Sequence, residues 1–383
     1  VIMDTVELSS KLIKFKSITP DNTGSIDYIQ KILKEKKFNC HMLESGTSKI
    51  KNLYASFKGG EGPNLCFAGH TDVVPPGDLK KWKTNPFEPQ ITNGRLYGRG
   101  ASDMKTAIAS FMVAAEIFLE ENKFAFDGTI SFLITSDEEG EAEFGTKSLI
   151  KWIKSKKKKI DYCLVGEPTN PNKLGEMIKI GRRGSLTGEL TIIGTQGHVA
   201  YPDRANNPST TIISILNELK KIKFDKGTKK FQPTNLEVTK ININNTADNI
   251  IPQSAEATFN IRFNNKHTSS SIKNKLNKIF QRISKRNKSK YKIIYKVSGE
   301  AFLTKPNKTT LLIQKIIQKI TKIKPKLSTT GGTSDARFIR KISPCLEFGL
   351  VGKNMHKIDE SVSLIDLRKL TRIYENILQN YFK

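Results

Sequence analysis

Histidine and carboxylate side chains occur where apolar runs or glycine-rich turns end, and their chemistry suits metal-assisted hydrolysis. The candidates are His70, Asp72, Asp103, Glu138, Glu139, Glu167 and His356. Imidazole nitrogens and carboxylate oxygens are ligands that Zn²⁺ accepts, while Co²⁺ or Mn²⁺ are alternatives because such donors discriminate weakly among divalent ions. Since the set contains no thiolate, we expect Zn²⁺ first. The residues together predict a hydrolase with two metal ions.

Three short apolar runs must position most of these side chains. Asn64–Gly69 precedes His70, Gly128–Thr135 precedes the glutamate pair, and Tyr162–Val165 precedes Glu167. Short apolar runs bounded by turn residues are typical of buried strands. Because open α/β sheets bind ligands at the carboxyl ends of their strands, the three runs predict one shared site.

The residues around His70 and Asp103 predict two further details of the site. Asp72 lies two positions after His70 and shares its face in an extended segment, so its carboxylate is expected to accept the spare imidazole N–H. Asp103 precedes the apolar-periodic stretch Thr106–Leu119, which predicts a helix with Asp103 near its N-terminus. A carboxylate there has two oxygens with which to bridge two cations.

The adjacent Glu138 and Glu139 are expected to do different work, because neighbouring side chains of an extended segment point in opposite directions. One can bind metal while the other faces the water to be activated. Taken singly, a glutamate after a strand is usually a solvated loop residue, and a lone histidine is more often structural than a ligand. The convergence of several strand ends favours the metal-site interpretation.

Longer motifs around these residues resemble a known family. The stretch from His70 to Lys105, which contains Gly98-Arg-Gly-Ala-Ser-Asp-Met-Lys, is similar to the co-catalytic zinc aminoacylase and carboxypeptidase family. Three further segments resemble the members that hydrolyse N-succinyl-LL-2,6-diaminopimelate to succinate and LL-2,6-diaminopimelate in bacterial lysine biosynthesis: Gly181–Ser185, Gln196–Pro202 and Gly331–Phe338. The likeness covers nearly the whole chain and is weakest in the lysine-rich region around residues 265 to 295.

The resemblance implies a role for each residue of the predicted metal site. One zinc ion would be bound by His70 and Glu167, the other by Glu139 and His356, with Asp103 as the bridge. Water bound to such ions ionises near neutral pH. Glu138 would act as the general base that takes a proton from this water, and would then return the proton to the leaving amine.

The resemblance also implies residues that contact the substrate. His198 would polarise the substrate carbonyl, and it would be contributed across the interface of a homodimer. Substrate carboxylates would be bound by Arg182, Ser185, Asn249, Arg262, Gly332 and Thr333. Arginine suits this task because its planar fork pairs with carboxylates, and a turn before a predicted helix Ser334–Ile342 could add backbone N–H donors.

The sequence departs from the family pattern at two places. Thr106 replaces the usual glycine after Asp-Met-Lys, a change that a helix tolerates or prefers. The segment Glu347–His356 lacks the usual proline after Phe-Gly and is one residue shorter. From the second departure we expect an altered geometry in the loop before His356.

The chain of 383 residues, 37% of them hydrophobic, is long enough for two domains. We predict an α/β fold in which residues 1–183 and 297–383 form a mixed-sheet, zinc-exopeptidase-like catalytic domain that closes with helices Asn307–Lys322 and Leu364–Tyr381. Residues 184–296 form an inserted α+β domain, which by resemblance is the lid and dimerisation domain. Its expected strands and helices are Ser185–Ile193, Leu236–Ile243, Ala255–Phe263, Pro208–Lys221 and Ser269–Arg286.

The net charge of +27 raises an alternative from another class, a nucleic-acid-binding protein. The lysines are spread along the chain, and runs such as Lys156–Lys159 lack interleaved aromatic residues. We therefore expect a small-molecule substrate and no nucleic-acid partner. Nearer alternatives within the family are an acetylornithine deacetylase, a carboxypeptidase or a carbamoyl hydrolase, which would use the same metals.

The cysteines and the first residues bear on location. The four cysteines are scattered without a metal-type spacing, as in a reduced protein rather than a disulfide framework: Cys40, Cys66, Cys163 and Cys345. Residues Val1–Glu7 show no basic-then-apolar signal pattern, and no apolar run is long enough to span a bilayer. We expect a cytoplasmic protein without a membrane partner.

Overall fold

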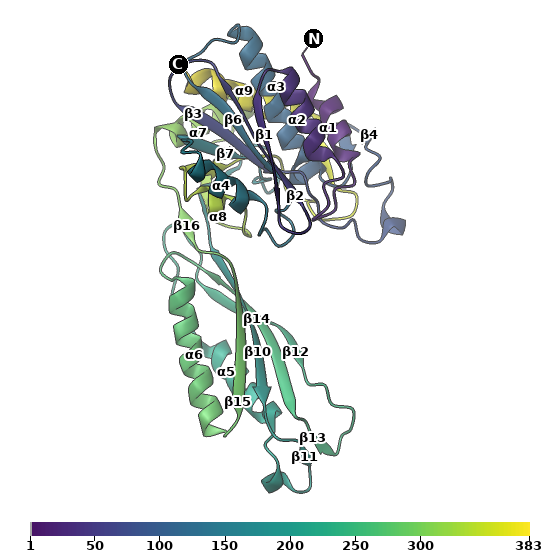
Figure 1. The fold of residues 1–383 in the computed structure, drawn as a ribbon, viewed down its shortest axis with the longest axis vertical. Helices are drawn as coiled ribbons and strands as arrows, with labels where there is room; N and C mark the ends of the chain where they lie inside the picture. The colour runs from purple at the N-terminus through teal and green to yellow at the C-terminus, as the bar shows by residue number, and fades with distance from the viewer. Residues whose placement is uncertain (1) are drawn as a thin grey trace. The chain divides into compact units, whose positions relative to one another are not determined.

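The computed structural model describes residues 2–383 and divides them into two compact units. Unit 1 comprises residues up to 180 together with 304–328 and 334–383, and unit 2 comprises 181–303 and 329–333 (Figure 1). Unit 2 therefore begins and ends a few residues outside the expected 184–296, and it also contains residues 329–333, which were expected in the catalytic domain. The difference arises because β9 (Gly181–Arg182) pairs with β16 (Phe302–Leu303), so the chain enters and leaves unit 2 as a strand pair.

A mixed sheet lies at the centre of unit 1, in the order β1-β2-β6-β3-β7-β18-β8-β17. Its strands are β1 (Asn39–Ser45), β2 (Ile50–Lys58), β3 (Asn64–His70), β6 (Thr129–Thr135), β7 (Tyr162–Val165), β8 (Met177–Lys179), β17 (Lys326–Ser328) and β18 (Cys345–Glu347). The three predicted strands are confirmed as β3, β6 and β7. They are parallel neighbours with β3 in the middle, so their carboxyl ends share one edge of the sheet.

Helices cover both faces of this sheet. On one face, Phe111 of α3 (Thr106–Glu121) stacks on Phe67 of β3 at 4.5 Å between ring centroids, and Tyr374 of α9 (Leu364–Tyr381) lies 5.7 Å from Phe67. On the other face, Trp152 of α4 (Thr146–Ser155) packs on Tyr54. Helices α1 (Thr5–Ile13), α2 (Ser25–Glu35) and α7 (Lys308–Thr321) complete the layers.

The helix predictions for unit 1 are confirmed for α3, α7 and α9 but not for the segment Ser334–Ile342. There the structure has a single turn, α8 (Ala336–Ile339), and turns continue to Ser343. Pro344 follows and disfavours helical geometry in the residue before it. The predicted length of this helix is therefore wrong. Among residues 2–383, no helix is long and apolar enough to cross a membrane.

Unit 2 contains an antiparallel sheet in the order β12-β14-β10-β15, packed against two helices. The elements are β10 (Gly184–Ile193), β12 (Asn235–Asn242), β14 (Ser254–Phe263), β15 (Lys290–Gly299), α5 (Pro208–Lys221) and α6 (Ser269–Arg286). Leu190, Phe259 and Ile261 of the sheet form one core with Ile212 of α5 and Phe280 of α6. The elements expected in this region are all confirmed, and β15 is an additional strand.

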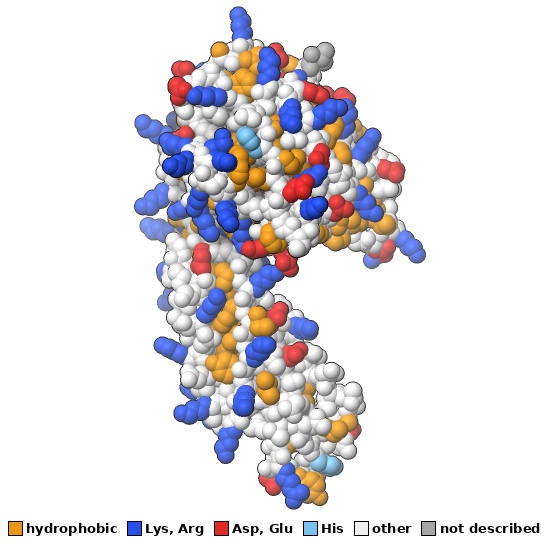
Figure 2. Space-filling model, in the orientation of Figure 1, with side chains coloured by type: hydrophobic (Ala, Val, Ile, Leu, Met, Phe, Trp, Pro, Cys, Tyr) orange, Lys and Arg blue, Asp and Glu red, His pale blue; other side chains and the backbone are white. Residues whose placement is uncertain are grey.

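The strand β15 was not among the predicted elements, because its lysines resemble a solvated segment. Tyr291, Ile293, Tyr295 and Val297 lie against the core of unit 2, and the residues between them are exposed. This alternation of inward and outward residues with a period of two is typical of a strand. The many lysines of the segment make the pattern hard to recognise. Lysines also protect an edge strand from pairing with other chains. Figure 2 shows Lys and Arg side chains over the visible faces of both units, interspersed with acidic and apolar groups.

Candidate metal centre

The carboxyl ends of β3, β6 and β7 bring four of the predicted residues together. His70 is the last residue of β3 and is 1% exposed, while the glutamate pair follows β6 and Glu167 follows β7. The Nε2 atom of His70 lies 3.5 Å from Oε1 of Glu167 and 3.8 Å from Oε2 of Glu138. The ligating atoms of these three residues lie within 4.8 Å of one another. Glu138 is thus placed beside the His70 group.

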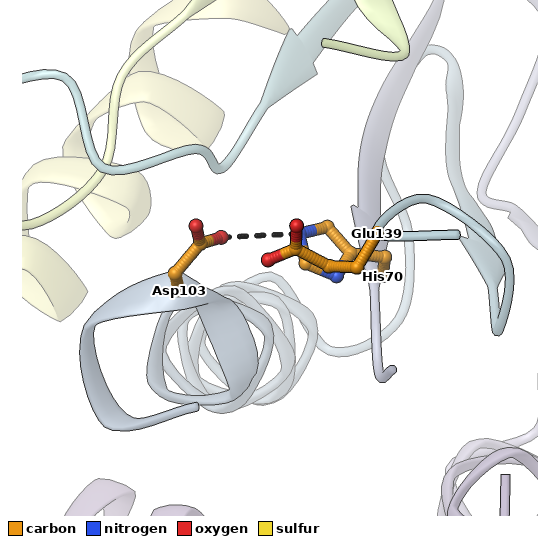
Figure 3. A group of neighbouring side chains, drawn as sticks. All are labelled: His70, Asp103 and Glu139. Carbon is orange, nitrogen blue, oxygen red and sulfur yellow. Dashed lines mark hydrogen bonds and ion pairs between the residues drawn. The ribbon is translucent and has the colours of Figure 1, made fainter. Parts of the chain in front are cut away.

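Asp103 lies between the two histidines, with one carboxylate oxygen toward each. Its Oδ1 atom is 3.1 Å from Nε2 of His70, and its Oδ2 atom is 3.1 Å from Nε2 of His356. Glu139 completes the second side, where its Oε1 atom lies 2.8 Å from Nε2 of His356. Figure 3 shows the Asp103 carboxylate directed at His70, with the Glu139 side chain beside the same ring. This geometry suits a carboxylate that bridges two cations.

The loop that carries His356 is the altered one, and it still brings the ring to the site. His356 has a positive φ of 62° and a half-exposed side chain, unlike the buried His70. Thr106, the other departure from the family pattern, is the first residue of α3 and donates its hydroxyl to the carbonyl of Ala101. Both departures are therefore compatible with the gathered side chains.

Asp72 has a broader structural role than the sequence predicts. The Nδ1 atom of His70 lies 2.9 Å from the backbone carbonyl oxygen of Asp72 and 3.5 Å from its carboxylate. The expected carboxylate hydrogen bond is therefore replaced by a backbone one, because the carboxylate is turned toward the glutamate pair. It accepts the backbone N–H groups of Glu138, at 3.1 Å, and Glu139, at 2.9 Å. Asp72 thereby orients His70 and both glutamates.

The charges of the cluster favour bound cations. Burial raises the pKa of Glu138 and of Glu167 well above the usual range, and neighbouring carboxylates raise both further. Burial alone would lower the pKa of His70, but its contacts with Asp103 and Asp72 outweigh burial and raise it well above the usual value. Buried carboxylates that crowd two imidazoles need positive charge nearby. Oxygen and nitrogen donors of this kind fit divalent metal ions, so the residues present suit the predicted metals.

Asn170 is a supporting residue that the sequence analysis missed. It is 1% exposed, its side-chain amide donates to the carbonyl of Gly349, and its backbone N–H donates to that of Leu350. The loop after β7, which holds Glu167, is thus joined to the loop after β18, which leads to His356. Its position three residues after the predicted ligand Glu167 was the signal that could have identified it.

Gly349 packs so closely on the Glu167 backbone that a side chain has no room. A Cβ atom there would lie 2.4 Å from the carbonyl oxygens of Gly166 and Glu167. Gly349→Ala should therefore displace the Glu167 loop and lower the free energy of unfolding by about 1–3 kcal/mol, as overpacking does. Denaturant titration of the purified variant measures this.

Gly332→Ala is the matched control for that stability measurement, because a Cβ atom at Gly332 meets no atom within 4 Å. Equal stabilities for both variants and the parent chain would contradict the close approach at Gly349. Metal content should also fall in Gly349→Ala, since Glu167 moves with the displaced loop.

Comparison with known proteins places the chain in a family. The model of peptidase family M20/M25/M40 matches residues 66–380. The chain belongs to this family. A curated relative, succinyl-diaminopimelate desuccinylase of Pelagibacter ubique, is 66% identical over 98% of this chain and 98% of its own length. The protein of the same name from Wolbachia pipientis wMel is 50% identical over 99% of this chain and 94% of its own.

Solved structures of family M20 proteins share the whole fold. A metallo-carboxypeptidase from Sulfolobus solfataricus matches with a TM-score of 0.79 at 20% identity, over 99% of each chain. A dinuclear metal-binding peptidase from Bacillus subtilis matches with a TM-score of 0.74 at 12% identity, over 99% of this chain and 97% of that one. At these identities the likeness shows the fold alone, and the fold agrees with the predicted α/β class.

The residues expected to bind substrate lie in unit 2 of this family M20/M25/M40 protein and form two groups. In the first group, the buried Arg182 donates to the carbonyl oxygen of Gly332 at 3.1 Å. Ser185 pairs with Arg262 across β10 and β14, and both side chains contact Asn260. Thr333 follows Gly332 in the same turn. Asn260 is a further residue that the sequence analysis missed.

His198 and Asn249 form the second group. His198 lies in β11 (Gly197–His198), which pairs with β13 (Ile250–Ile251), and the carbonyl of Asn249 accepts the N–H of Val199. The backbone N–H of Ala200 donates to Nδ1 of His198 at 3.1 Å. This contact leaves Nε2 as the protonated nitrogen of the neutral ring, which is the form that can donate a hydrogen bond. Both residues are exposed.

Proposed function

We propose that the protein hydrolyses N-succinyl-LL-2,6-diaminopimelate to succinate and LL-2,6-diaminopimelate, as a metal-dependent amidohydrolase of bacterial lysine and diaminopimelate biosynthesis. The observation that carries the proposal is the Asp103 carboxylate, whose two oxygens each lie 3.1 Å from a different histidine, with Glu138 beside the His70 group. The relative that is 66% identical over nearly the full length supports the choice of substrate.

The metal ions would be held by the gathered imidazoles and carboxylates, with Zn²⁺ first and Co²⁺ as an alternative. The residues are His70, Asp103, Glu139, Glu167 and His356. Such ions supply Lewis acidity, which lowers the pKa of water to roughly 7 and polarises a carbonyl group. Family membership and the nitrogen and oxygen donor set support this assignment.

Glu138 performs the proton transfers in the proposed reaction. Its carboxylate takes a proton from the attacking water and delivers it to the nitrogen of the breaking amide bond, so that the amine can leave. The backbone N–H of Glu138 is held by Asp72 at 3.1 Å, which restricts the loop that carries the base. His198 donates its Nε2–H to the substrate carbonyl oxygen, where negative charge develops.

The arginines of unit 2 would bind the anionic ends of the substrate. Arg182 and Arg262 carry planar donor forks that match carboxylates. Ser185, Asn249 and the Gly332–Thr333 turn add neutral donors. The pairing of Ser185 with Arg262 and the contact of Arg182 with Gly332 support a common binding region for the first group.

The decisive experiment is hydrolysis of N-succinyl-LL-2,6-diaminopimelate by protein that has been treated with a chelator and then given Zn²⁺. We expect succinate release only after metal is returned, and N-acetylornithine at the same concentration should be a much poorer substrate. If the protein hydrolyses only N-acetylornithine, the proposed metal chemistry stands but the proposed substrate is wrong. Equal activity with and without metal would contradict the mechanism.

We also propose a homodimer in which His198 acts on the active site of the partner subunit. Unit 2 supplies exposed apolar residues and exposed edge strands that a second copy can cover, among them Val199, Tyr201, Ile213, Ile241 and Ile294. Mixing His198→Ala with Glu138→Gln tests this, because only hybrid dimers combine an intact Glu138 with an intact partner His198. Activity of the mixture near that of either variant alone would contradict a contribution across the interface.

We propose a cytoplasmic location from the use of cysteine. Cys66, Cys163 and Cys345 are buried and free in the core of unit 1, and Cys40 is also free. Unpaired core thiols are typical of reducing compartments. Cell fractionation with an antibody against the protein tests this, and recovery in the periplasmic fraction would contradict it.

A further inference from the structure

A buried ion pair joins the segments that carry the proposed metal ligands. Arg99 and Glu360 are 2% and 0% exposed, and Nη1 of Arg99 lies 2.8 Å from Oε2 of Glu360. Arg99 also lies over the ring of Trp82, 5.2 Å from its centroid. Neither residue belongs to the predicted site. Their contacts are directed at backbone groups rather than at other charged side chains.

Glu360 holds the turn that presents Asp103. Its Oε1 atom accepts the backbone N–H groups of Asp103, at 3.0 Å, and Ser102, at 2.9 Å. Its Oε2 atom accepts the N–H of Gly100 at 3.1 Å. A side chain near the carboxyl end of the sequence therefore accepts three backbone N–H groups of this turn, including that of the proposed bridging ligand Asp103.

Arg99 extends the same connection to two more ligand-bearing segments. Its Nη1 atom donates to the carbonyl oxygen of Lys357 at 2.9 Å, and Lys357 directly follows His356. Its Nη2 atom donates to the carbonyl oxygen of Pro75 at 3.3 Å, in the loop that follows His70 and Asp72. The guanidinium thus contacts the backbone next to His356 and the loop that follows His70, while its partner Glu360 contacts the backbone of Asp103.

We propose that Arg99 and Glu360 are positioning residues that set the separation of Asp103 and His356, and therefore the binding of the second metal ion. This inference rests on the proposed metal-dependent function. A buried ion pair can often be replaced by apolar groups without loss of stability, so stability alone does not account for it. The backbone contacts of the pair explain it instead, because they fix the geometry of the metal ligands. Removing side chains that support metal ligands typically weakens metal affinity by about 10–100-fold.

The test compares Glu360→Gln with Glu116→Gln by titrating metal-free protein with Co²⁺. Glu116 is a matched control, since it is 3% exposed, pairs with Lys36 and accepts the N–H of Met3 at 3.0 Å, none of which belongs to a ligand-bearing segment. Glu360→Gln keeps one acceptor but loses the charge and the second acceptor. We expect its second Co²⁺ to bind about 10–100-fold more weakly, with the first little changed.

Two further readouts separate positioning from a loss of folding. In Glu360→Gln the electron paramagnetic resonance signature of two Co²⁺ ions that share a bridge should be lost, and kcat should fall by about 10–100-fold with little change in KM. Thermal unfolding of the metal-free proteins records stability. Glu116→Gln should lower stability while its Co²⁺ affinities and spectrum match those of the parent chain.

Arg99→Lys is the second test variant, to be used if Glu360→Gln does not fold. It keeps a positive charge near Glu360 but lacks the fork that reaches Lys357 and Pro75 together, so it should also weaken the second ion. Parent-like affinity for two Co²⁺ ions in the folded variants would overturn this inference and leave the proposed function intact. A parent chain that binds no Co²⁺ would instead contradict the proposed function.

Discussion

Replacing Glu138 with glutamine should lower kcat for the succinylated substrate by about 10²–10⁴-fold, the usual contribution of a positioned acid and base. Glutamine has nearly the same shape, so the backbone contact with Asp72 is kept, but its amide cannot accept and return a proton. Burial, together with nearby carboxylates, raises the pKa of Glu138 well above the usual range against the opposing effect of His70. Steady-state kinetics with saturating Zn²⁺ measure the effect.

Metal content distinguishes a base from a ligand at this position. The Glu138 carboxylate lies close enough to His70 and Glu167 to contribute to a metal group, so both roles are geometrically open to it. If Glu138 is the base, Glu138→Gln binds as much Zn²⁺ as the parent chain. Loss of a metal ion in step with activity would make Glu138 a ligand instead. Glu143→Gln, an exposed change in the same loop, should leave both quantities unchanged.

Replacing Asp103 with asparagine should have a comparably large effect through metal binding. An amide offers one oxygen, whereas the Asp103 carboxylate presents one oxygen to His70 and the other to His356. The variant should retain at most one ion per chain after dialysis and lose at least about a hundred-fold in kcat, because even indirect supports of metal ligands commonly cost that much. Elemental analysis of the dialysed protein gives the metal content.

Asp27→Asn is the control for the loss of a carboxylate. Asp27 is a partly exposed residue in the first turn of α2 that pairs with Lys51 at 2.8 Å, and such surface pairs contribute little. Its metal content and kcat should equal those of the parent chain. Two ions per chain in Asp103→Asn would refute the bridging role, whatever its activity.

Strands and helices were predicted from local patterns of apolar residues, and these patterns are clearest where a strand is fully buried. The runs before His70, Glu138 and Glu167 are short, apolar and bounded by turn residues, and each forms a strand of the central sheet. The strand β15 was missed because alternate lysines concealed its inward residues. The predicted helix Ser334–Ile342 is longer than the observed one, because the helical pattern carries no information about the turns that lead to Pro344.

The support behind the site was not accessible from local patterns. Asn170 and the pair of Arg99 and Glu360 act on backbone carbonyl and N–H groups, which every residue possesses and which leave no trace in a sequence. The Asp72 carboxylate illustrates the same limit. Its spacing from His70 was correct for a contact, but the competing N–H donors of Glu138 and Glu139 lie in the loop after another strand and could not be foreseen.

The sequence by itself indicated the side chains that we propose carry the chemistry, because residue types, strand ends and family motifs can be read along the chain. It also indicated that three segments of the proposed site share a sheet edge, since parallel strands end together. Only the tertiary structure decided that one oxygen of Asp103 meets His70 and the other meets His356, residues far apart in the sequence. Distances between such groups depend on how distant segments pack and pair their backbones, and no local pattern encodes that packing.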